Sequence, residues 1–294
     1  MLIDGVFSGG GIKGFALIGA YEEIEKRGFS FARVAGTSAG SIIAALITAG
    51  YSSKQIFELL NDLDLKTFMD IRKSPIPLSL ARWLLIYWKM GLYKGNNLEK
   101  WIEEKLAQKG LKTFSDLAPQ TLRVIASDLS NGRILVIPDD LPKYGISPGS
   151  FSIARAIRMS CSLPYFFEPV KLKTSTGTNI VVDGGVLSNF PMWLFDQENT
   201  KKVRPVLGIK LSHQEQDNPI NKVNNAIQLF EALFETMKDA HDSRYISRKH
   251  EKNIIFIPTE GVATTEFKLT QKKKNSLMEV GRESAKNFFE TWRY

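Results

Sequence analysis

The residue best placed to do chemistry is a serine between glycines. Gly36-Thr37-Ser38-Ala39-Gly40 fits the pattern G-x-S-x-G, with an apolar strand-like run before it and a helix-like run after it. Small flanking residues allow the sharp strand-to-helix turn that exposes a serine hydroxyl, so this segment predicts a nucleophile elbow in which Gly36 and Gly40 flank Ser38. The helix that follows would place the positive end of its dipole beneath developing negative charge.

A glycine-rich turn comes earlier in the chain, where Gly9–Gly14 joins a strand-like run to a helix-like run. Its spacing also satisfies the dinucleotide fingerprint G-x-G-x-x-G, but the second strand, Phe31–Ala35, runs into glycine instead of the acidic residue that this fingerprint requires. A P-loop is excluded because Lys13 precedes glycine rather than serine or threonine. Consecutive glycines let backbone N–H groups approach a phosphate or the oxyanion of acyl transfer. Together with the serine motif, this turn favours acyl transfer.

An activated serine needs a base, and Asp183 is the candidate that the pattern favours. The apolar run Ile180–Val182 delivers this aspartate to the end of a strand, and Gly184-Gly185 makes a turn after it. Open α/β sheets place their sites at such strand ends, and a carboxylate in a dry site is basic enough to accept a serine proton. His213 is the alternative, because serine, aspartate and histidine would then follow the order of ordinary α/β-hydrolases.

The elements that must position these residues alternate between strand-like and helix-like patterns, which predicts an α/β domain with a largely parallel sheet. Strands are expected at Leu2–Phe7, Phe31–Ala35, Leu122–Ala126, Arg133–Ile137, Asn179–Val182, Val206–Leu211 and Ile254–Ile257. Helices are expected from Phe15 to Gly28 and at Ser41–Ala49, Gln55–Leu63, Asn96–Lys109, Phe151–Met159, Val223–Tyr245 and Thr270–Trp292. Because strand patterns continue to residue 257 without a low-complexity linker, we expect one domain.

The apolar segment Leu78–Tyr93 has the composition of a membrane interface. Aromatic and aliphatic side chains alternate there with basic ones: Arg82, Trp83, Leu84, Leu85, Tyr87, Trp88, Lys89 and, just beyond, Lys94. Such a mixture suits lipid headgroups. A core helix, an oligomer interface or a lid fits the same pattern, so peripheral membrane contact stays open at this point.

Composition excludes several classes of protein. The chain has 294 residues, a net charge of +8 that is spread along its length, three histidines and one cysteine. No apolar run reaches the roughly 18 residues that a membrane span needs, and the N-terminus lacks the pattern of a secretory signal. Cys161 alone forms no intrachain disulfide, which fits a reducing compartment. Without zinc-ligand spacing or an aromatic-basic strand motif, we expect no nucleic-acid partner.

The three motifs, in this order, resemble those of the patatin-like phospholipases. The similar region runs from about Gly5 to Leu194, so we expect a patatin-like core at residues 5–195, with the C-terminal strands and helices of residues 196–294 packed onto the same domain. The resemblance implies a three-layer α/β/α fold with a mostly parallel central sheet. It also implies a carboxylic ester hydrolase of the phospholipase A or lysophospholipase type, acting on phospholipids, lysophospholipids or neutral glycerides without calcium or any cofactor.

The resemblance further assigns roles to individual residues. Ser38 would be the nucleophile and Asp183 the base of a dyad that needs no histidine; the third motif is Asp-Gly-Gly here, where the family more commonly has Asp-Gly-Ala. Backbone N–H groups of the first motif, which also carries a basic residue, would form the oxyanion hole: Gly9, Gly10, Gly11, Lys13 and Gly14. Ser160–Pro164 is similar to the family's Ser/Ala-rich segment, and Asp128 to an aspartate beside the site.

Location and alternative functions follow from the same comparison of patterns. Bacterial cytoplasmic members are the most similar in length and plan, so we expect a cytoplasmic protein, and nothing indicates its oligomeric state. One alternative is a Ser-Asp-His esterase with His213 as base, and another is a non-catalytic lipid-binding protein, against which the three intact motifs argue. Dinucleotide binding would require saturable binding of NAD. Cys161 lacks an elbow or a histidine and is not expected to be a rival nucleophile.

Overall fold

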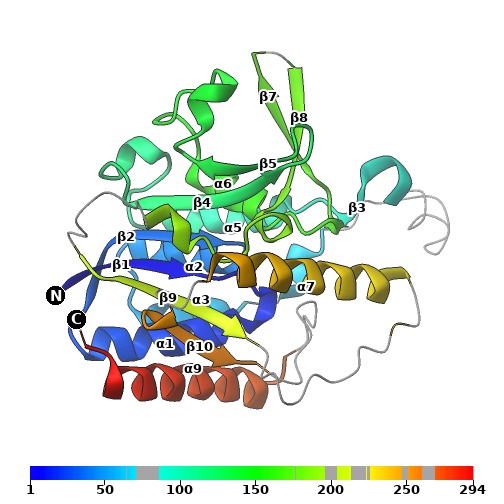
Figure 1. Ribbon diagram of the computed structural model, residues 1–294. Coiled ribbons are helices and arrows are strands. Elements are labelled where there is room, and N and C mark those ends of the chain that lie inside the picture. Colours follow the sequence, from blue (N-terminus) through cyan, green and yellow to red (C-terminus); the bar gives the residue numbers. More distant parts are fainter. Residues whose placement is uncertain are drawn as a thin grey trace.

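The computed structural model describes residues 1–63, 65–70, 86–175, 177–195, 204–212, 223, 226–246, 251–259 and 269–293. Within them, one large sheet forms the centre of the molecule (Figure 1). Its strands are β1 Leu2–Phe7, β2 Ser30–Thr37, β4 Leu122–Asp128, β5 Arg133–Ile137, β7 Val170–Thr174, β8 Gly177–Asp183, β9 Val206–Ser212 and β10 Ile254–Pro258. A second, two-stranded sheet pairs β3 Gly91–Tyr93 with β6 Tyr165–Phe167.

The strand order is β10-β9-β1-β2-β4-β8-β7, with β5 paired to β4. From β10 to β4 all neighbours are parallel, whereas β5 and β8 run antiparallel to β4 and β7 runs antiparallel to β8. The expected α/β architecture with a mostly parallel central sheet is therefore confirmed. β9 pairs directly with β1, so the C-terminal third of the chain extends the same sheet.

Seven α-helices are described, and their labels follow Figure 1. They are α1 Gly14–Lys26, α2 Ala39–Thr48, α3 Ser53–Asn61, α5 Asn96–Ala107, α6 Ile153–Ser160, α7 Ala226–Tyr245 and α9 Gln271–Thr291. Local chemistry sets their ends. Ser52 begins α3 through a capping box with Gln55, and Thr270 Oγ1 accepts from the Lys273 N–H to begin α9.

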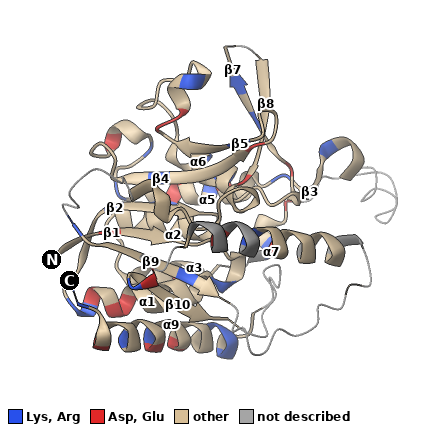
Figure 2. Ribbon diagram, viewed as in Figure 1, with Lys and Arg blue, Asp and Glu red and all other residues tan. Residues whose placement is uncertain are grey.

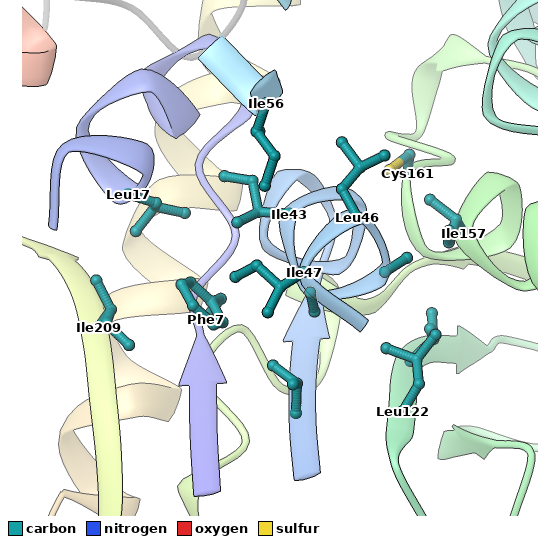
Figure 3. Packing of buried hydrophobic residues seen from close by; sticks show 14 of the residues in the cluster. Phe7, Leu17, Ile43, Leu46, Ile47, Ile56, Leu122, Ile157, Cys161 and Ile209 are labelled. Atoms are coloured by element: carbon teal, nitrogen blue, oxygen red, sulfur yellow. The ribbon is translucent and has the colours of Figure 1, made fainter. Parts of the chain in front are cut away.

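Hydrophobic side chains fill both faces of the sheet. The larger core joins the strands to α1, α2, α6 and α9; Figure 3 shows Phe7 and Ile209 of the strands packed with Leu17 of α1 and Ile43 of α2. On the opposite face Val6, one residue from Phe7, packs in a smaller cluster under residues 190–195. Alternate residues of a strand point to opposite faces. A short strand such as β1 can therefore contribute side chains to both cores.

The pattern of the sequence missed β3, β6 and β7. β3 and β6 have three residues each and exist only because Gly91 and Tyr93 pair with Tyr165 and Phe167, far along the chain. β7 forms a hairpin with β8 beyond the main run of parallel strands. The strands β3 and β6 depend on long-range pairing, and strands of so few residues carry little periodicity of their own.

The first half of the apolar segment Leu78–Tyr93 lies outside the described residues, which resume at residue 86. Residues 86–89 are helical, and Tyr87 and Trp88 are 77% and 71% exposed, so these two rings are not part of the core. Across the described part of the chain, no helix has both the length and the hydropathy to cross a bilayer. Figure 2 shows Lys and Arg interspersed with Asp and Glu, for example along α9.

Helices α1 and α9 pack closely against each other through two glycines. A Cβ atom at Gly281 would lie 1.9 Å from the Ala16 carbonyl oxygen, and one at Gly19 would lie 2.0 Å from the Met278 carbonyl oxygen. No side chain fits at such distances, so the two backbones are in direct contact. Since α1 begins at the glycine-rich turn, α9 fixes the helix on which that turn is built.

We predict that Gly281→Ala lowers the free energy of unfolding by about 1–3 kcal/mol through overpacking. Alanine is the better helix former by about 1 kcal/mol, so propensity alone predicts the opposite sign. Denaturant unfolding followed by circular dichroism measures the difference.

Gly149→Ala is the matched control, because the nearest atom to an added Cβ there is Ser115 Cβ at 3.6 Å. It should leave stability within about 0.5 kcal/mol of wild type. A Gly281→Ala variant as stable as this control would contradict the close packing of α1 and α9.

Candidate active site

Ser38 lies at the junction of β2 and α2 in a conformation that residues other than glycine rarely adopt. Its φ is 51° and its ψ is −126°. Its backbone N–H donates to Ser160 Oγ at 2.8 Å, and its carbonyl accepts from Ser41 Oγ at 2.6 Å. Such backbone strain costs about 1–3 kcal/mol and persists only where the surroundings determine it. These two serines therefore hold the turn that exposes the Ser38 hydroxyl.

The glycines on either side of this serine are required by close approach. A Cβ at Gly36 would lie 2.4 Å from the Gly40 carbonyl oxygen, and a Cβ at Gly40 would lie 2.4 Å from the Phe7 carbonyl oxygen. The start of α2 thus rests directly on the ends of β1 and β2. Any side chain at either position would push the turn open, as the serine motif predicts.

Strand register brings Asp183 to Ser38. Thr37 pairs with Ile125 on β4, and the next residue on β4, Ala126, pairs with Asp183 on β8. The Ser38 hydroxyl donates to Asp183 Oδ2 at 2.7 Å, although the two residues are 145 positions apart. Asp183 Oδ1 accepts from the Gly185 N–H at 2.7 Å, which orients the carboxylate. The predicted nucleophile and its favoured base are therefore in direct contact.

Burial makes this carboxylate more basic. Asp183 is 2% exposed, and removal from water raises its pKa from 3.8 to about 6. The hydrogen bonds from Gly185 and Ser38, together with the positive charge of Lys238, favour the ionised form and limit the rise of the pKa. At neutral pH the group is ionised and is a stronger proton acceptor than an exposed aspartate.

The glycine-rich turn lies against the elbow. The Gly9 N–H donates to the Asn189 carbonyl at 3.2 Å, whereas Gly10 and Gly11 line a cavity together with Ser38. Gly11 has φ 56°, a left-handed conformation that suits glycine. Gly14 begins α1 and also lines the cavity. Lys13 is 5% exposed and is not among the described residues that line this cavity.

The cavity that opens at Ser38 is apolar. Its empty volume is about 1050 Å³, including the open mouth. The walls come from six helical segments, the loop before β6 and β6 itself: Phe15, Ile42, Ile43, Leu60, Phe68, Leu98, Trp101, Leu163, Phe166 and Phe234. Its few polar lining groups are gathered at one place: Ser38, Asp183, Asn189 and Lys238. A site with a dry wall and one polar corner fits an acyl chain with its ester at the serine.

Three residues at this site were not singled out from the sequence. Ser160 was recognisable only as part of the Ser/Ala-rich segment; its hydroxyl holds the backbone of Ser38 and donates to the Ile125 carbonyl at 2.5 Å. Asn189 follows Asp183 by six residues, and Lys238 lies on α7. No local pattern distinguishes an asparagine or a lysine that meets the site only after folding.

Two other expectations can be compared with the structure. Asp128 is not among the described residues that line the cavity, and its carboxylate accepts hydrogen bonds from Tyr144, Asn131 and Asn179 at the β4–β5 hairpin. Its expected place beside the site stays a prediction. Cys161 is buried, and burial raises the pKa of its thiol, which makes it a poor nucleophile. Among the described residues, no group of three or more His, Cys, Asp or Glu side chains could hold a metal ion.

The histidine alternative falls on residues that the structure does not describe. His213 and His250 lie outside the described ranges, as does the side chain of His241. The Ser38 hydroxyl donates to Asp183 directly, with no histidine between them.

Comparison with known proteins gives a consistent result. A family model described as patatin-like phospholipase matches residues 5–196. The uncharacterized protein YqhO of Bacillus subtilis is 56% identical over 294 residues, which covers 100% of both chains. The cUMP-AMP-activated phospholipase of Escherichia coli is 31% identical over 198 residues, covering 62% of this chain and 54% of that protein.

Solved structures share the fold at low identity. VipD from Legionella pneumophila superposes with a TM-score of 0.58 at 17% identity, covering 99% of this chain and 67% of that chain. ExoU, in its complex with SpcU from Pseudomonas aeruginosa, gives a TM-score of 0.54 at 19% identity, covering 98% of this chain and 51% of that chain.

We predict that Asp183→Asn makes the protein more stable at pH 8, by about 1–3 kcal/mol in the free energy of unfolding. The pKa of Asp183 is higher in the folded protein than its ordinary value of 3.8. Between about pH 4 and pH 6 the folded state therefore holds a proton that the unfolded chain has released, and stability falls as the pH rises through this window. Asparagine removes the buried charge. The difference in unfolding free energy between the variant and wild type should therefore be smaller at pH 5, where Asp183 of the folded wild type is largely protonated.

Asp4→Asn serves as the comparison, because Asp4 is 1% exposed but forms ion pairs with Arg33 and Arg204. That variant should lose stability. Urea unfolding at pH 5 and pH 8 measures the free energy of unfolding of both variants. If Asp183→Asn were the less stable protein at pH 8, the burial penalty on Asp183 would be disproved.

Proposed function

The chain belongs to the patatin-like phospholipase family, and from that premise we propose that it is a serine hydrolase of lipid acyl esters with a Ser38–Asp183 dyad. The observation that carries the proposal is the 2.7 Å hydrogen bond from the Ser38 hydroxyl to a buried carboxylate, at the polar corner of an apolar cavity. An exposed serine on a strained turn, a proton acceptor and a dry acyl-sized site are what ester hydrolysis requires.

In the first half of the proposed reaction, Ser38 Oγ attacks the ester carbonyl carbon while its proton passes to Asp183 Oδ2. The carbonyl oxygen becomes an oxyanion beside Gly10 and Gly11, whose N–H groups and the N-terminal end of α2 stabilise it. The C–O bond to the leaving alcohol then breaks, and the alcohol takes the proton from Asp183. An acyl-serine remains in the cavity.

In the second half, water attacks the acyl-serine. Asp183 accepts one proton of this water, the same backbone donors hold the second oxyanion, and the proton returns to Ser38 Oγ as the fatty acid leaves. The base must be ionised at the start of each half, which a pKa of about 6 permits at neutral pH. No metal or organic cofactor takes part in these steps.

The two alternatives differ in testable ways. A Ser-Asp-His esterase would need His213 as base, whereas a lipid-binding protein would hold an acyl chain without cleaving it. The direct contact of Ser38 with Asp183 favours the dyad, and the strained turn at Ser38 favours catalysis, since binding alone has no need of that strain. Dinucleotide binding is disfavoured because the cavity beside Gly9–Gly14 is apolar.

We also propose that residues 196–294 belong to the catalytic domain. β9 pairs with β1, and Phe234 and Lys238 of α7 line the cavity. The boundary expected near residue 195 and the cytoplasmic location stay predictions.

Ser38→Ala should reduce the release of p-nitrophenol from medium-chain esters by more than about 10³-fold, because no other group replaces the nucleophile. The variant should keep its melting temperature and its binding of fatty acid. A folded Ser38→Ala variant that retains turnover would refute the elbow assignment. A wild-type protein that binds fatty acid but cleaves no ester would establish the lipid-binding alternative.

The base is decided by two further variants. Asp183→Asn should lose turnover as severely as Ser38→Ala, and His213→Ala should stay within about twofold of wild type. For wild type, kcat/KM should rise with pH through an apparent pKa of about 6, because the protonated carboxyl accepts no proton. A histidine base also titrates near this pH. The pH profile therefore does not distinguish the two bases, and the two variants must do so. An inactive His213→Ala variant together with an active Asp183→Asn variant would overturn the dyad.

The cavity should set the preferred acyl length. Leu60→Trp fills part of its wall, so kcat/KM for p-nitrophenyl palmitate should fall about 10-fold relative to the butyrate, the loss of about two buried CH₂ groups. Leu59→Trp is the matched control, since Leu59 lies on the same helix and lines a different surface hollow. Equal palmitate-to-butyrate ratios in both variants would show that the acyl chain lies elsewhere.

A further inference from the structure

A buried polar cluster lies behind the glycine-rich turn and has no part in the steps above. Asn189, Asp242 and Lys210 are 2%, 2% and 7% exposed. Asn189 Nδ2 donates to Asp242 Oδ2 at 3.2 Å, and Lys210 Nζ lies 3.3 Å from the same oxygen. The three residues come from the loop after β8, from α7 and from β9, so only the folded chain brings them together.

Asn189 holds the glycine-rich turn in two ways. Its carbonyl accepts the Gly9 N–H at 3.2 Å. Its side-chain Oδ1 lies against the Gly9 backbone, 2.5 Å from where a Cβ atom would stand, and it also borders Gly185. Gly9 in turn packs against Ser38, whose Cβ is 3.2 Å from that same Cβ position. A shift of Asn189 would therefore move the turn that lies beside the nucleophile.

The neighbouring residue ties the same loop to the elbow. The Ser188 carbonyl accepts from Thr37 Oγ1 at 3.0 Å. One short loop is thus bonded to both halves of the site: Ser188 to the strand that carries the nucleophile, and Asn189 to the turn that carries the backbone donors. The two hydrogen bonds of this loop come from backbone carbonyls, whereas the Asn189 side chain places Oδ1 against Gly9 and Gly185. Asp242 accepts from Nδ2 and so sets the orientation of that amide.

Stability does not account for the aspartate. Within the described residues, Asp242 Oδ1 is buried without a hydrogen-bond partner. An unsatisfied buried carboxylate oxygen is costly, and a buried ion pair is often no more stable than apolar residues of the same size. A polar group kept at such a cost beside a residue of the site is more readily explained by the geometry that it imposes on that residue.

We propose that Asp242, paired with Lys210, is a positioning residue of the active site: it orients the Asn189 amide, which holds Gly9 so that the N–H groups of Gly10 and Gly11 face the oxyanion. The proposal rests on the proposed function. It makes α7, which lies beyond the region matched by the family model, a working part of the site. Asp242 acts through Asn189 and touches no substrate.

The test compares Asp242→Asn with Asp4→Asn, a buried and ion-paired aspartate on β1 whose partners are Arg33 and Arg204. With a p-nitrophenyl ester, Asp242→Asn should lower kcat/KM about 10- to 100-fold, less than the roughly 10²- to 10³-fold loss of an oxyanion donor. KM should change by less than about twofold. Asp4→Asn should keep wild-type kcat.

A trifluoromethyl ketone that carries the acyl chain of the ester substrate separates a positioning role from damage to the fold. Its adduct with Ser38 places an oxyanion beside the N–H groups of Gly10 and Gly11, as the transition state does. Its inhibition constant should rise in Asp242→Asn by the same factor as kcat/KM falls. Affinity for the product fatty acid should stay unchanged. A double variant, Asp242→Leu with Lys210→Met, leaves no unpaired buried charge and should show the same loss in a stably folded protein.

Two results would overturn the proposal: inhibition and kcat/KM within about twofold of wild type in the folded double variant, or a fall in kcat without weaker ketone binding. Nuclear magnetic resonance gives a readout that needs no turnover. The amide resonances of Gly9–Gly11 should shift in Asp242→Asn and not in Asp4→Asn, and unchanged resonances would refute the positioning. A wild type that cleaves no ester would instead refute the proposed function, while these resonances would still decide the role of Asp242.

Discussion

The strained backbone at Ser38 is the constraint on which the rest of the site depends. Its positive φ survives because Ser160 accepts its N–H, Ser41 donates to its carbonyl, and glycines at positions 36 and 40 allow β1, β2 and α2 to meet. The buried side chains of α2, among them Ile43 and Leu46, hold that helix on the sheet. Burial of two such side chains contributes about 3–6 kcal/mol, which exceeds the cost of one strained residue.

The same geometry explains why the proposed base is buried. Asp183 is delivered beside Ser38 by a strand that runs antiparallel to β4, so the proposed dyad needs no third group to bridge the two residues. Removal of the carboxylate from water makes it a better proton acceptor and a poorer contributor to stability. In the proposed mechanism, activity and stability therefore oppose each other at this one side chain, as is common where a protein keeps a charge in a dry site.

The C-terminal third of the chain is joined to this site at several points. β9 extends the sheet beside β1, and Leu211 of β9 donates its N–H to Ser8 Oγ at 3.0 Å, at the start of the glycine-rich turn. α9 packs on α1 through glycines, and Phe234 of α7 lies 3.1 Å from a Cβ position at Gly185. The described segments beyond residue 196 thus pack against the glycine-rich turn, against α1 and against the third motif.

The sequence by itself determined the parts of this protein that are local: the elbow, the glycine-rich turn, the aspartate at a strand end and the alternation of strands and helices. Each depends on backbone conformation or periodicity over a few neighbouring residues, so a short window of sequence contains it. Only the tertiary structure decided what meets across long distances. It placed Ser160 at the elbow and Asn189 at the glycine-rich turn, bonded Asp128 to Tyr144, paired β3 with β6, and brought Asn189 and Lys210 to Asp242. Such contacts follow from strand register and helix packing over the whole chain, and no local pattern of residue types encodes them.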